Sequence, residues 1–575
     1  MASFPEPPPP VPPTSDADLD AAADRLAERK DAWTKVGIPE RIAYLESILA
    51  GLSSVAEPWV DGGARLKGIA PGDPLVGEEW LAGPVVTARN ARLLIDALRA
   101  GGTPSAKPSP GPEGRTIARV FPHGMLEKVM LAGVTADVWT QPGKPATRGR
   151  IYRERSEHGK VCLVLGGGNV SSIPPMDVLY KLFVEDEVCL LKMNPVNEHV
   201  GPRLEKAFAR LVDDGFLRVV YGGADVGARA ADHPRVDTLH VTGSDRTYDA
   251  IVWGATPEER AERKAKKEPK NPRPFSAELG CVTPVLVVPG PWSAADIAFQ
   301  ARHVAGMVTQ NASFNCNAAK VLVTARGWLQ REAFLDALHA ELGRSPARKA
   351  YYPGASQRYE AFLGAYPGAV KLGRPGDDVV PWTVIPDVPA EAGEYALTNE
   401  AFCGVLAEVT LDVAARRGGV MRDAPYADPA RFLEEAVRFA NERCWGTLSC
   451  VVLVHPATAA EHGAALERAI EGLRYGGVGV NGWPGLLYGL VSPTWGAFPG
   501  HAPEDIQSGV GVVHNTHMFD HPEKTVLRAP FRQMPAPPYV GGVKNLAELG
   551  RRMFELETSP TWGKLAGVAV TALKG

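Results

Sequence analysis

The fold of this chain is decided by the stretch Val161-Cys162-Leu163-Val164-Leu165-Gly166-Gly167-Gly168-Asn169. Its first five residues are all apolar, which is typical of a parallel strand buried on both faces. The glycines and the asparagine that follow suit a tight turn at the end of such a strand. Because the pattern over 176–186 predicts a helix, the stretch indicates a strand–loop–helix unit.

The same unit recurs downstream. Strands are predicted at 188–192, 217–221 and 238–241, and helices at 200–212 and 224–232. Strands that alternate with helices indicate a parallel α/β sheet, and such sheets bind ligands at the carboxyl ends of their strands. A cofactor site is therefore predicted, although none of these strands is followed by a GxGxxG motif. The residues at these strand ends are Asn169, Lys192, Gly222, Gly243 and Ser244.

A second set of alternating elements follows, so a second α/β domain is predicted. Its strands are expected at 284–288, 321–323, 406–409 and 450–454, and its helices at 292–308, 328–342, 429–443 and 457–473. Before the first sheet, helical spacing appears at 16–30, 38–52 and 88–100, and 117–155 alternates as strands do. A chain of 575 residues is expected to form two or three domains.

Two segments fall outside this pattern. Residues 1–15 are rich in proline and predict a disordered tail. Residues 256–274 are charged and interrupted by prolines, so we expect an insertion on the solvated surface.

The composition excludes several classes of protein. A net charge of −4 without a basic face argues against nucleic-acid binding. The chain has no apolar run long enough for a membrane span and no signal-peptide pattern. Its seven cysteines are scattered without CxxC or Cys/His spacing, so we expect reduced thiols, no metal site and a cytoplasmic location.

One cysteine stands out by its neighbours. Cys316 ends the stretch Asn311-Ala312-Ser313-Phe314-Asn315-Cys316 and is followed by the apolar run 321–323. Small residues let a substrate approach the sulfur, and amides donate hydrogen bonds to an oxyanion without adding charge. These features favour a nucleophilic thiol, while the alternative is ordinary buried packing.

Seven short motifs, in this order, resemble those of the aldehyde dehydrogenase superfamily. The resemblance runs from about 160 to 515 and is weaker over 20–100. The motifs are Asn169-Val170-Ser171-Ser172-Ile173-Pro174, Leu191-Lys192, Thr242-Gly243-Ser244, Glu278-Leu279-Gly280-Cys281, the stretch ending at Cys316, Glu400-Ala401-Phe402-Cys403-Gly404 and Gly477-Val478-Gly479-Val480-Asn481.

The resemblance implies a Rossmann-type cofactor domain (16–130 and 156–278), an α/β catalytic domain (279–515) and oligomerisation or C-terminal segments (131–155 and 516–575). It also implies NAD- or NADP-dependent oxidation of an aldehyde to a carboxylic acid through a cysteine thioester. The implied roles are Cys316 as nucleophile, Asn169 as oxyanion donor, Glu278 as general base, Lys192, Gly243 and Ser244 at the adenosine and pyrophosphate, and Glu400 and Phe402 at the nicotinamide ribose.

The sequence departs from the family pattern at several positions. Gly168 replaces a tryptophan, Pro195 replaces a carboxylate that favours NAD, and Tyr248 replaces a glycine. Ser313-Phe314 replaces Gly-Gln, and one residue is missing between Cys316 and Lys320.

Two other functions stay open at this stage. An acylating enzyme or acyl-CoA reductase would pass the thioester to coenzyme A, although such relatives often lack the glutamate present here as Glu278. A catalytically silent scaffold would only bind nucleotide.

An aromatic substrate tunnel of Phe314, Trp445, Trp483 and Trp495 is weighed against ordinary core packing. A homodimer or homotetramer is expected, because the family pairs a hairpin, here 130–155, with a neighbouring subunit.

Overall fold

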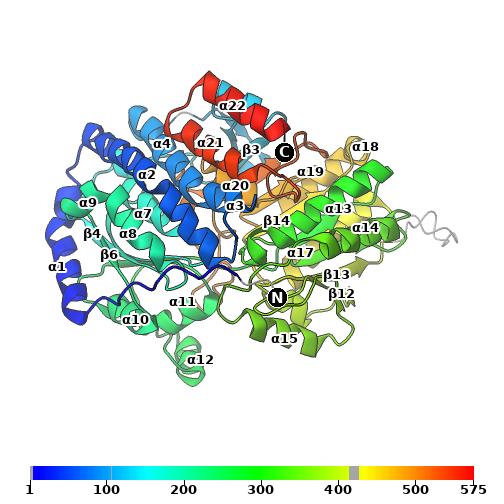
Figure 1. Ribbon diagram of the computed structural model, residues 1–575, viewed down its shortest axis with the longest axis horizontal. Helices are drawn as coiled ribbons and strands as arrows, with labels where there is room; N and C mark the ends of the chain where they lie inside the picture. The colour runs from blue at the N-terminus through cyan, green and yellow to red at the C-terminus, as the bar shows by residue number, and fades with distance from the viewer. Residues whose placement is uncertain (1–3, 105, 414–426, 575) are drawn as a thin grey trace.

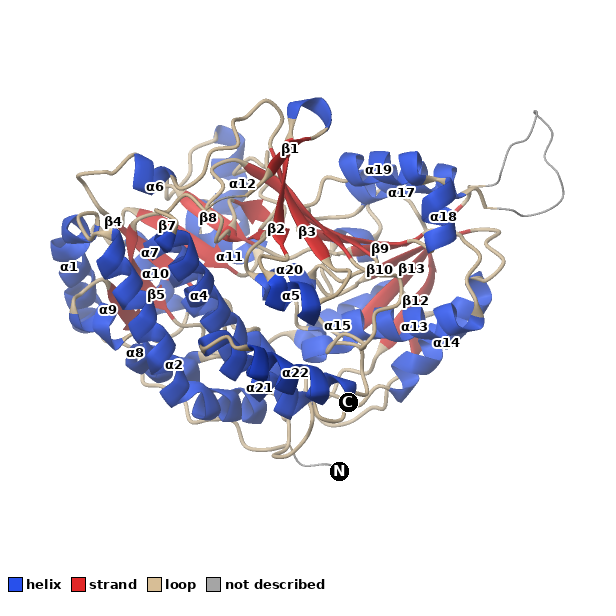
Figure 2. Cartoon of the chain, turned by 90° about the horizontal axis from the view of Figure 1, so that it is seen from above, coloured by secondary structure: helices blue, strands red, loops and turns tan. Residues whose placement is uncertain are grey.

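The computed structural model describes residues 4–104, 106–413 and 427–574, and it is built around two sheets (Figures 1 and 2). The first has six strands, which are parallel except for the short edge strand β17. In spatial order the strands are β17 (Gly509–Val510), β8 (Phe275–Glu278), β7 (Thr238–Thr242), β4 (Lys160–Leu165), β5 (Glu187–Lys192) and β6 (Leu217–Val220). The predicted α/β fold is confirmed.

Helices on both sides of this sheet seal its apolar strands from water. Helix α1 lies against β4 and β5, and α7 also lies against β5. The helices of this half of the chain are α1 (Asp16–Trp33), α2 (Ile38–Leu66), α3 (Val76–Trp80), the π-turn η1 (Leu81–Val85), α4 (Val86–Arg99), α5 (Met125–Met130), α6 (Arg150–Arg153), α7 (Ile173–Phe183), α8 (Gly201–Ala207), α9 (Ala209–Asp213), α10 (Ala224–Asp232), α11 (Asp245–Val252) and α12 (Pro257–Lys266).

The second sheet has eleven strands, with a parallel centre running from β19 to β12. Its spatial order is β1 (Pro108–Pro110), β2 (Thr116–Phe121), β3 (Thr135–Thr140), β19 (Pro522–Arg528), β15 (Gly477–Val480), β14 (Ser449–Leu453), β9 (Pro284–Val287), β10 (Val321–Ala325), β13 (Val405–Leu411), β12 (Thr383–Val388) and β11 (Val370–Lys371). The helices of this half are α13 (Ala294–Thr309), α14 (Arg331–Arg344), α15 (Ala355–Ala365), α16 (Tyr395–Thr398), α17 (Pro429–Arg443), α18 (Pro456–Glu461), α19 (Gly463–Gly472), α20 (Gly485–Leu490), α21 (Leu546–Thr558) and α22 (Trp562–Leu573). A small sheet joins β16 (Thr494–Trp495) to β18 (Val513–His514).

The ribbon expected at 130–155 is arranged differently from the prediction. Strand β3 forms there, but its antiparallel partners are β2 and β19, whereas the expected second strand contains the short helix α6. Strand β19 lies between β3 and β15, so it joins the ribbon to the large sheet within one chain. Lys524 of β19 adds hydrogen bonds of 2.6–3.2 Å to three carbonyls, those of Ile470, Glu471 and Leu473.

These contacts remove the reason given for a homodimer or homotetramer. That reason assumed that the ribbon has no partner strand in its own chain, and β19 is such a partner. Strands β1 and β2, placed by sequence in the cofactor domain, belong to the same ribbon. The oligomer stays a prediction, and it requires a surface other than this edge of β3.

The proline-rich N-terminus was expected to be disordered, but residues 4–15 lie extended along the first half of the chain. The Val11 N–H donates to Glu198 Oε1 at 3.0 Å, and the Thr14 N–H donates to the Tyr221 carbonyl at 3.0 Å. Proline lowers the conformational entropy of the unfolded segment, so fixing it costs less than fixing other residues. Residues 1–3 lie outside the described part.

The insertion at 256–274 lies on the surface, as expected. Most of it forms α12, which has no buried residue and is capped by the Thr256 side chain. The sequence did not predict this helix, because prolines flank it on both sides. One of them, Pro257, occupies the first helical turn, where proline is tolerated.

Candidate functional site

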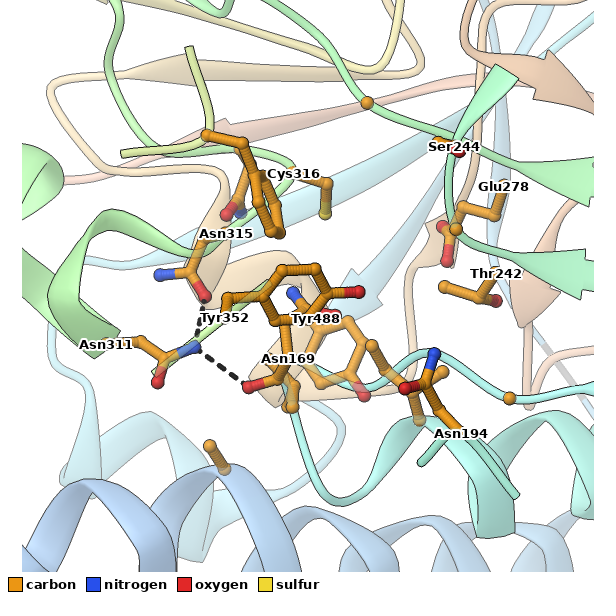
Figure 3. A pocket seen from close by; sticks show the side chains of 18 of the residues that line it. Asn169, Asn194, Thr242, Ser244, Glu278, Asn311, Asn315, Cys316, Tyr352 and Tyr488 are labelled. Carbon is orange, nitrogen blue, oxygen red and sulfur yellow. Dashed lines mark hydrogen bonds between the residues drawn. The ribbon is translucent and has the colours of Figure 1, made fainter. Parts of the chain in front are cut away.

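A single cavity of about 1010 Å³ collects the eight residues that were given catalytic or cofactor roles, whereas the strand-end residue Gly222 does not line it. It lies at the carboxyl ends of the six-stranded sheet and extends to the Cys316 loop (Figure 3). The predicted residues on its wall are Cys316, Glu278, Asn169, Lys192, Gly243, Ser244, Glu400 and Phe402. The structure therefore places all eight in one cavity, and their individual roles stay predictions.

The Cys316 loop is held in an unusual backbone conformation. It follows α13 through a turn in which Asn311, Ala312 and Ser313 have φ values of 54°, 55° and 69°. Positive φ is uncommon for residues other than glycine, and runs of it require support from the surroundings. Asn311 provides that support, because its Nδ2 donates to the Asn169 carbonyl at 3.0 Å and to Asn315 Oδ1 at 3.1 Å (Figure 3).

Two N–H donors belong to residues that line the cavity, Asn169 and Cys316. The Asn169 Nδ2 donates one hydrogen to the Phe314 carbonyl at 2.9 Å. An amide nitrogen carries two hydrogens, so one stays available for a ligand. Within the part of the chain that the structure describes, the Cys316 N–H has no hydrogen bond to another protein group. Together these donors can form an oxyanion hole.

The thiol itself is the only partly exposed cysteine among the seven, all of which are described and free. Its burial raises the pKa of Cys316, and the nearby Glu278 and Glu400 carboxylates raise it further, whereas Lys320 lowers it. The thiol is therefore neutral in the free protein at neutral pH. Attack on a carbonyl requires a group that takes its proton.

A buried lysine supports the loop from behind, and the sequence reading assigned it no function. Lys320 Nζ donates to the carbonyls of Cys281, Asn315, Cys316 and Ala318 at 2.8–3.2 Å. It also lies 3.1 Å from Glu400 Oε1. One cation thus fixes both the nucleophile loop and the carboxylate predicted to hold the nicotinamide ribose. Its only signal in the sequence is its position just before β10.

Glu278 ends β8, and its side chain is buried with Oε1 unpartnered. Burial raises the pKa of Glu278 well above its usual range, and the charge of Asp177 contributes to the increase. A raised carboxyl pKa suits a general base that must take a proton from water near neutral pH. Figure 3 shows Glu278 and Cys316 facing the same cavity.

Behind Glu278, polar side chains cross an otherwise apolar interface between α7 and the sheet. Thr242 lies beside Glu278 in the register of β7 and β8, and its hydroxyl donates to Asp177 at 2.8 Å. His240 lies 3.3 Å from Asp177 and bonds to Ser276 at 2.9 Å. Buried polar groups are retained when they are hydrogen-bonded to one another. The sequence reading missed Asp177, because it treated 176–186 only as a helix.

Replacing Asp177 with asparagine should shift the acid limb of the pH–rate profile to lower pH. The Asp177 charge raises the pKa of Glu278, so neutralising it lowers that pKa, and the base is then ionised at a lower pH. The measurement is the steady-state rate from pH 5 to 9. Asp237→Asn is the control, because Asp237 pairs with Lys30 at the opposite end of β7. An unchanged limb in Asp177→Asn would show that Asp177 does not act on the base.

The other end of the cavity carries the residues predicted for the cofactor. Lys192 ends β5, and burial lowers the pKa of Lys192 although Asp225 and Glu198 oppose the decrease. Its Cε lies 3.9 Å from where a Cβ on Gly227 of α10 would be. Ser244 caps α11 by accepting the Thr247 N–H at 3.2 Å. A helix N-terminus of this kind favours an anionic group.

Glu400 and Phe402 approach the cavity from the second half of the chain. A Cβ on Gly280 would lie 1.9 Å from Glu400 Oε2, so only glycine allows the carboxylate to sit there. Arg358, which sequence reading missed, also lines the cavity. Its guanidinium donates to the Ala401 and Phe402 carbonyls at 3.1 and 3.2 Å and lies over the Phe402 ring. Glu400 and Phe402 are thereby fixed beside the Cys316 loop.

The departures from the family pattern have structural reasons here. A Cβ on Gly168 would lie 2.5 Å from Asn194 Oδ1, so Asn194 occupies the space of a larger residue. The Tyr248 ring is buried, and its centroid lies 5.0 Å from the centroid of the Phe275 ring. Phe314 is buried against Tyr351 and does not line the cavity, whereas the three predicted tryptophans do: Trp445, Trp483 and Trp495.

The fold and the site define a two-domain α/β protein with a thiol, an amide and a carboxylate around one ligand cavity. The model of the aldehyde dehydrogenase family matches residues 184–350. N-succinylglutamate 5-semialdehyde dehydrogenase of Ectopseudomonas mendocina is 23% identical over 237 residues, which are 41% of this chain and 40% of that protein. The chain thus matches less than half the length of that curated relative.

Solved structures of the family share the fold over nearly the whole chain. Gamma-glutamyl-gamma-aminobutyraldehyde dehydrogenase from Burkholderia cenocepacia is 19% identical, with a TM-score of 0.58 and 90% of each chain covered. Betaine aldehyde dehydrogenase from Staphylococcus aureus, in complex with NAD⁺, is 14% identical, with a TM-score of 0.60. The match covers 90% of this chain and 89% of that chain. Residues 184–350 of this protein therefore match the aldehyde dehydrogenase family, and the chain shares the fold of solved aldehyde dehydrogenases.

None of the helices in 4–104, 106–413 and 427–574 is both long and apolar enough to span a membrane. Over the same ranges, no group of three or more His, Cys, Asp or Glu side chains is placed to hold a metal ion.

Proposed function

We propose that this protein oxidises an aldehyde to a carboxylic acid with NAD or NADP. The observation that carries the proposal is the convergence of Cys316, Asn169 and Glu278 on one cavity whose other end holds Lys192 and Ser244. The thiol, the amide donor and the unpartnered carboxylate are the groups that thioester chemistry needs.

The cavity fits a nicotinamide dinucleotide at its Lys192 end. Gly223, Gly227 and Gly243 leave room for close approach of a ligand to the backbone, and all three line the cavity. Lys192 would bind the adenosine ribose, Ser244 and the start of α11 the pyrophosphate, and Glu400 the nicotinamide ribose. Family members in complex with NAD⁺ support the same choice of cofactor. When bound, the oxidised nicotinamide supplies the hydride acceptor.

The residues of the chain would then act in sequence. The Cys316 thiol gives its proton to water or to the Glu278 carboxylate, and its sulfur adds to the aldehyde carbon. The oxyanion then accepts hydrogen bonds from Asn169 Nδ2 and the Cys316 N–H. One such donor is typically worth about 3–4 kcal/mol of transition-state stabilisation. After the hydride leaves, the acyl group is held as a thioester on Cys316. Glu278 takes a proton from water, which displaces the thiolate and releases the carboxylic acid.

The test is incubation of the pure protein with a panel of aldehydes and either NAD or NADP, followed by absorbance of the reduced cofactor. Turnover with release of one acid per reduced cofactor supports the proposal. Cofactor binding without turnover on any aldehyde would instead favour a silent nucleotide-binding scaffold. Seven free cysteines support a reducing compartment such as the cytoplasm.

Discrimination between NAD and NADP should be weak. Pro195 stands where a carboxylate would exclude a 2′-phosphate, and the nearby Glu198 already accepts the Val11 N–H. We expect kcat/KM for the two cofactors to differ by less than about a thousandfold, or about 4 kcal/mol. Glu198→Gln should leave this ratio within about threefold. A larger preference for NAD that disappears in Glu198→Gln would make Glu198 the selecting carboxylate.

A further inference from the structure

Besides the residues predicted for the cofactor and the chemistry, the cavity is lined by helices from the two halves of the chain. Side chains from η1, α4, α5, α20 and α21 contribute to this part of the wall. Six apolar side chains among them define what we call the apolar arm: Leu81, Val86, Met130, Leu486, Leu546 and Met553. None of the six is among the residues proposed to bind the cofactor, so the arm is the part of the wall left for the body of a substrate.

Two carboxylates on the wall of the arm are already paired inside the protein. Glu78 lies 2.8 Å from Arg348, and Glu79 lies 2.7 Å from Lys67. All four side chains are buried. Leaving one member of a buried ion pair without its partner is strongly unfavourable. Neither carboxylate is therefore free to bind a cationic substrate.

Arg89 of α4, which also lines the cavity, is paired as well. Arg89 donates to Glu557 at 2.9 Å and to Glu127, and its Nε donates to the Leu490 carbonyl at 2.8 Å. Arg92 also bonds to Glu557. The two arginines and the two glutamates cancel in charge. Arg89 therefore cannot bind a substrate carboxylate without breaking this cluster.

Neutral hydrogen bonding in the arm is also limited. The Trp495 indole N–H is buried and has no partner within the described residues, and its side chain lines the cavity. A single neutral donor suits one oxygen of a substrate. It does not replace the solvation that a carboxylate loses in an apolar site.

Helix α21 closes the arm and is fixed in place by close packing. A Cβ on Gly77 would lie 2.3 Å from the Leu546 carbonyl oxygen, and a Cβ on Gly550 would lie 2.5 Å from the Trp80 Cβ. The ion pair of Arg89 with Glu557 holds the other end of the helix. The arm therefore has a fixed length, at which Met553 faces the cavity.

We propose that the apolar arm selects uncharged aldehydes with an extended apolar chain, and that α21 sets the preferred chain length. The proposal rests on the aldehyde-oxidising function proposed above. It follows from an apolar wall whose charged groups are all paired within the protein.

The first experiment compares linear aldehydes from propanal to decanal with succinic semialdehyde, a carboxylate-bearing aldehyde. For each methylene that fits the arm, kcat/KM should rise roughly three- to fourfold. The rise should stop at the length that α21 allows. Succinic semialdehyde should lie at least about a hundredfold below pentanal, because its carboxylate loses solvation without gaining a partner.

The second experiment fills the arm. Met553→Trp should lower the ratio of kcat/KM for octanal to that for propanal by about tenfold or more, because the added volume shortens the arm. Met534→Trp is the matched control, since Met534 is 87% exposed and does not line the cavity. In this control the ratio should stay at the wild-type value. Calorimetric binding of octanamide, an unreactive neutral analogue, should weaken in Met553→Trp only.

The outcomes separate this proposal from the proposed function. If aldehydes are oxidised but kcat/KM is flat with chain length, or succinic semialdehyde is preferred to pentanal, the apolar selectivity is wrong and the function stands. If no aldehyde is oxidised, the proposed function is wrong. Octanamide binding then tests whether the apolar arm binds neutral apolar chains. Loss of binding in Met553→Trp supports this role of the arm, and no binding to the wild type overturns it.

Discussion

Cys316→Ala should abolish aldehyde oxidation, with a loss of at least about a thousandfold, while cofactor binding stays intact. The acyl group has no other place to form a thioester, because Cys316 is the only cysteine on the cavity wall within the described residues. The side chain is partly exposed, so removing its sulfur leaves little strain. The measurements are initial rates and cofactor affinity by fluorescence. More than a few per cent of residual activity would exclude Cys316 as the nucleophile.

Cys281→Ala is the control for this variant. Cys281 lies near Glu278 in sequence, but its side chain is fully buried, and its sulfur accepts the Thr283 N–H at 3.3 Å. Losing that contact can lower stability by about 1–2 kcal/mol. The rate should stay within about twofold of the wild type. A loss as large as that of Cys316→Ala would point to a shared effect on folding.

The sequence was sufficient for several central strands of both sheets and for the eight predicted residues that share the cavity wall. Strands such as β4 and β5 are continuous apolar runs because both faces are buried, and this pattern is local. In a parallel sheet the carboxyl ends of the strands meet at one edge. Residues at the ends of predicted strands therefore had to lie together, which is why Asn169, Lys192 and Ser244 share one cavity.

Strand pairing at the edge of the large sheet could not be predicted in the same way. Strand β3 pairs with β19, which lies almost at the other end of the chain. The residues of β3 do not identify that partner, because an alternating strand can pair with any strand edge that presents free N–H and C=O groups. The family resemblance favoured a neighbouring subunit, whereas the structure supplies the partner within the chain.

The polar groups that support the site were also missing from the sequence reading. Lys320, Asp177 and Arg358 each lie in a segment that reads as ordinary helix, turn or strand. Their importance depends on what surrounds them after folding. Lys320, for example, meets four carbonyls that come from separate parts of two loops. Spacing along the chain carries no signal of such contacts.

The choice between hydrolysis and transfer to coenzyme A depends on Glu278. A carboxylate with an unpartnered oxygen and a raised pKa, at the end of β8 and facing the same cavity as Cys316, is suited to take a proton from water. An acylating enzyme would not need this base, since the thiol of coenzyme A attacks without it. A strong rise in wild-type turnover on adding coenzyme A would therefore favour the acylating alternative.

Glu278→Gln should leave acylation intact and make release of the acid rate-limiting. Glutamine keeps the shape of the side chain but cannot take a proton, and removing a general base typically costs about a hundred- to ten-thousandfold. Mixing the variant with aldehyde and cofactor should give a rapid burst of reduced cofactor, close to one per active site, followed by a slow steady rate. Stopped-flow absorbance measures both phases.

Three outcomes of this experiment have distinct meanings. Turnover at the wild-type rate would remove Glu278 from the mechanism. Absence of a burst would show that acylation has failed, and Glu278 would then be the group that takes the proton from Cys316. That role is chemically reasonable, because burial and the neighbouring carboxylates raise the pKa of the thiol, so the thiol does not ionise unaided at neutral pH. A burst with a slow second phase would assign the proton transfer from water to Glu278, since only the step after thioester formation would then have lost its base.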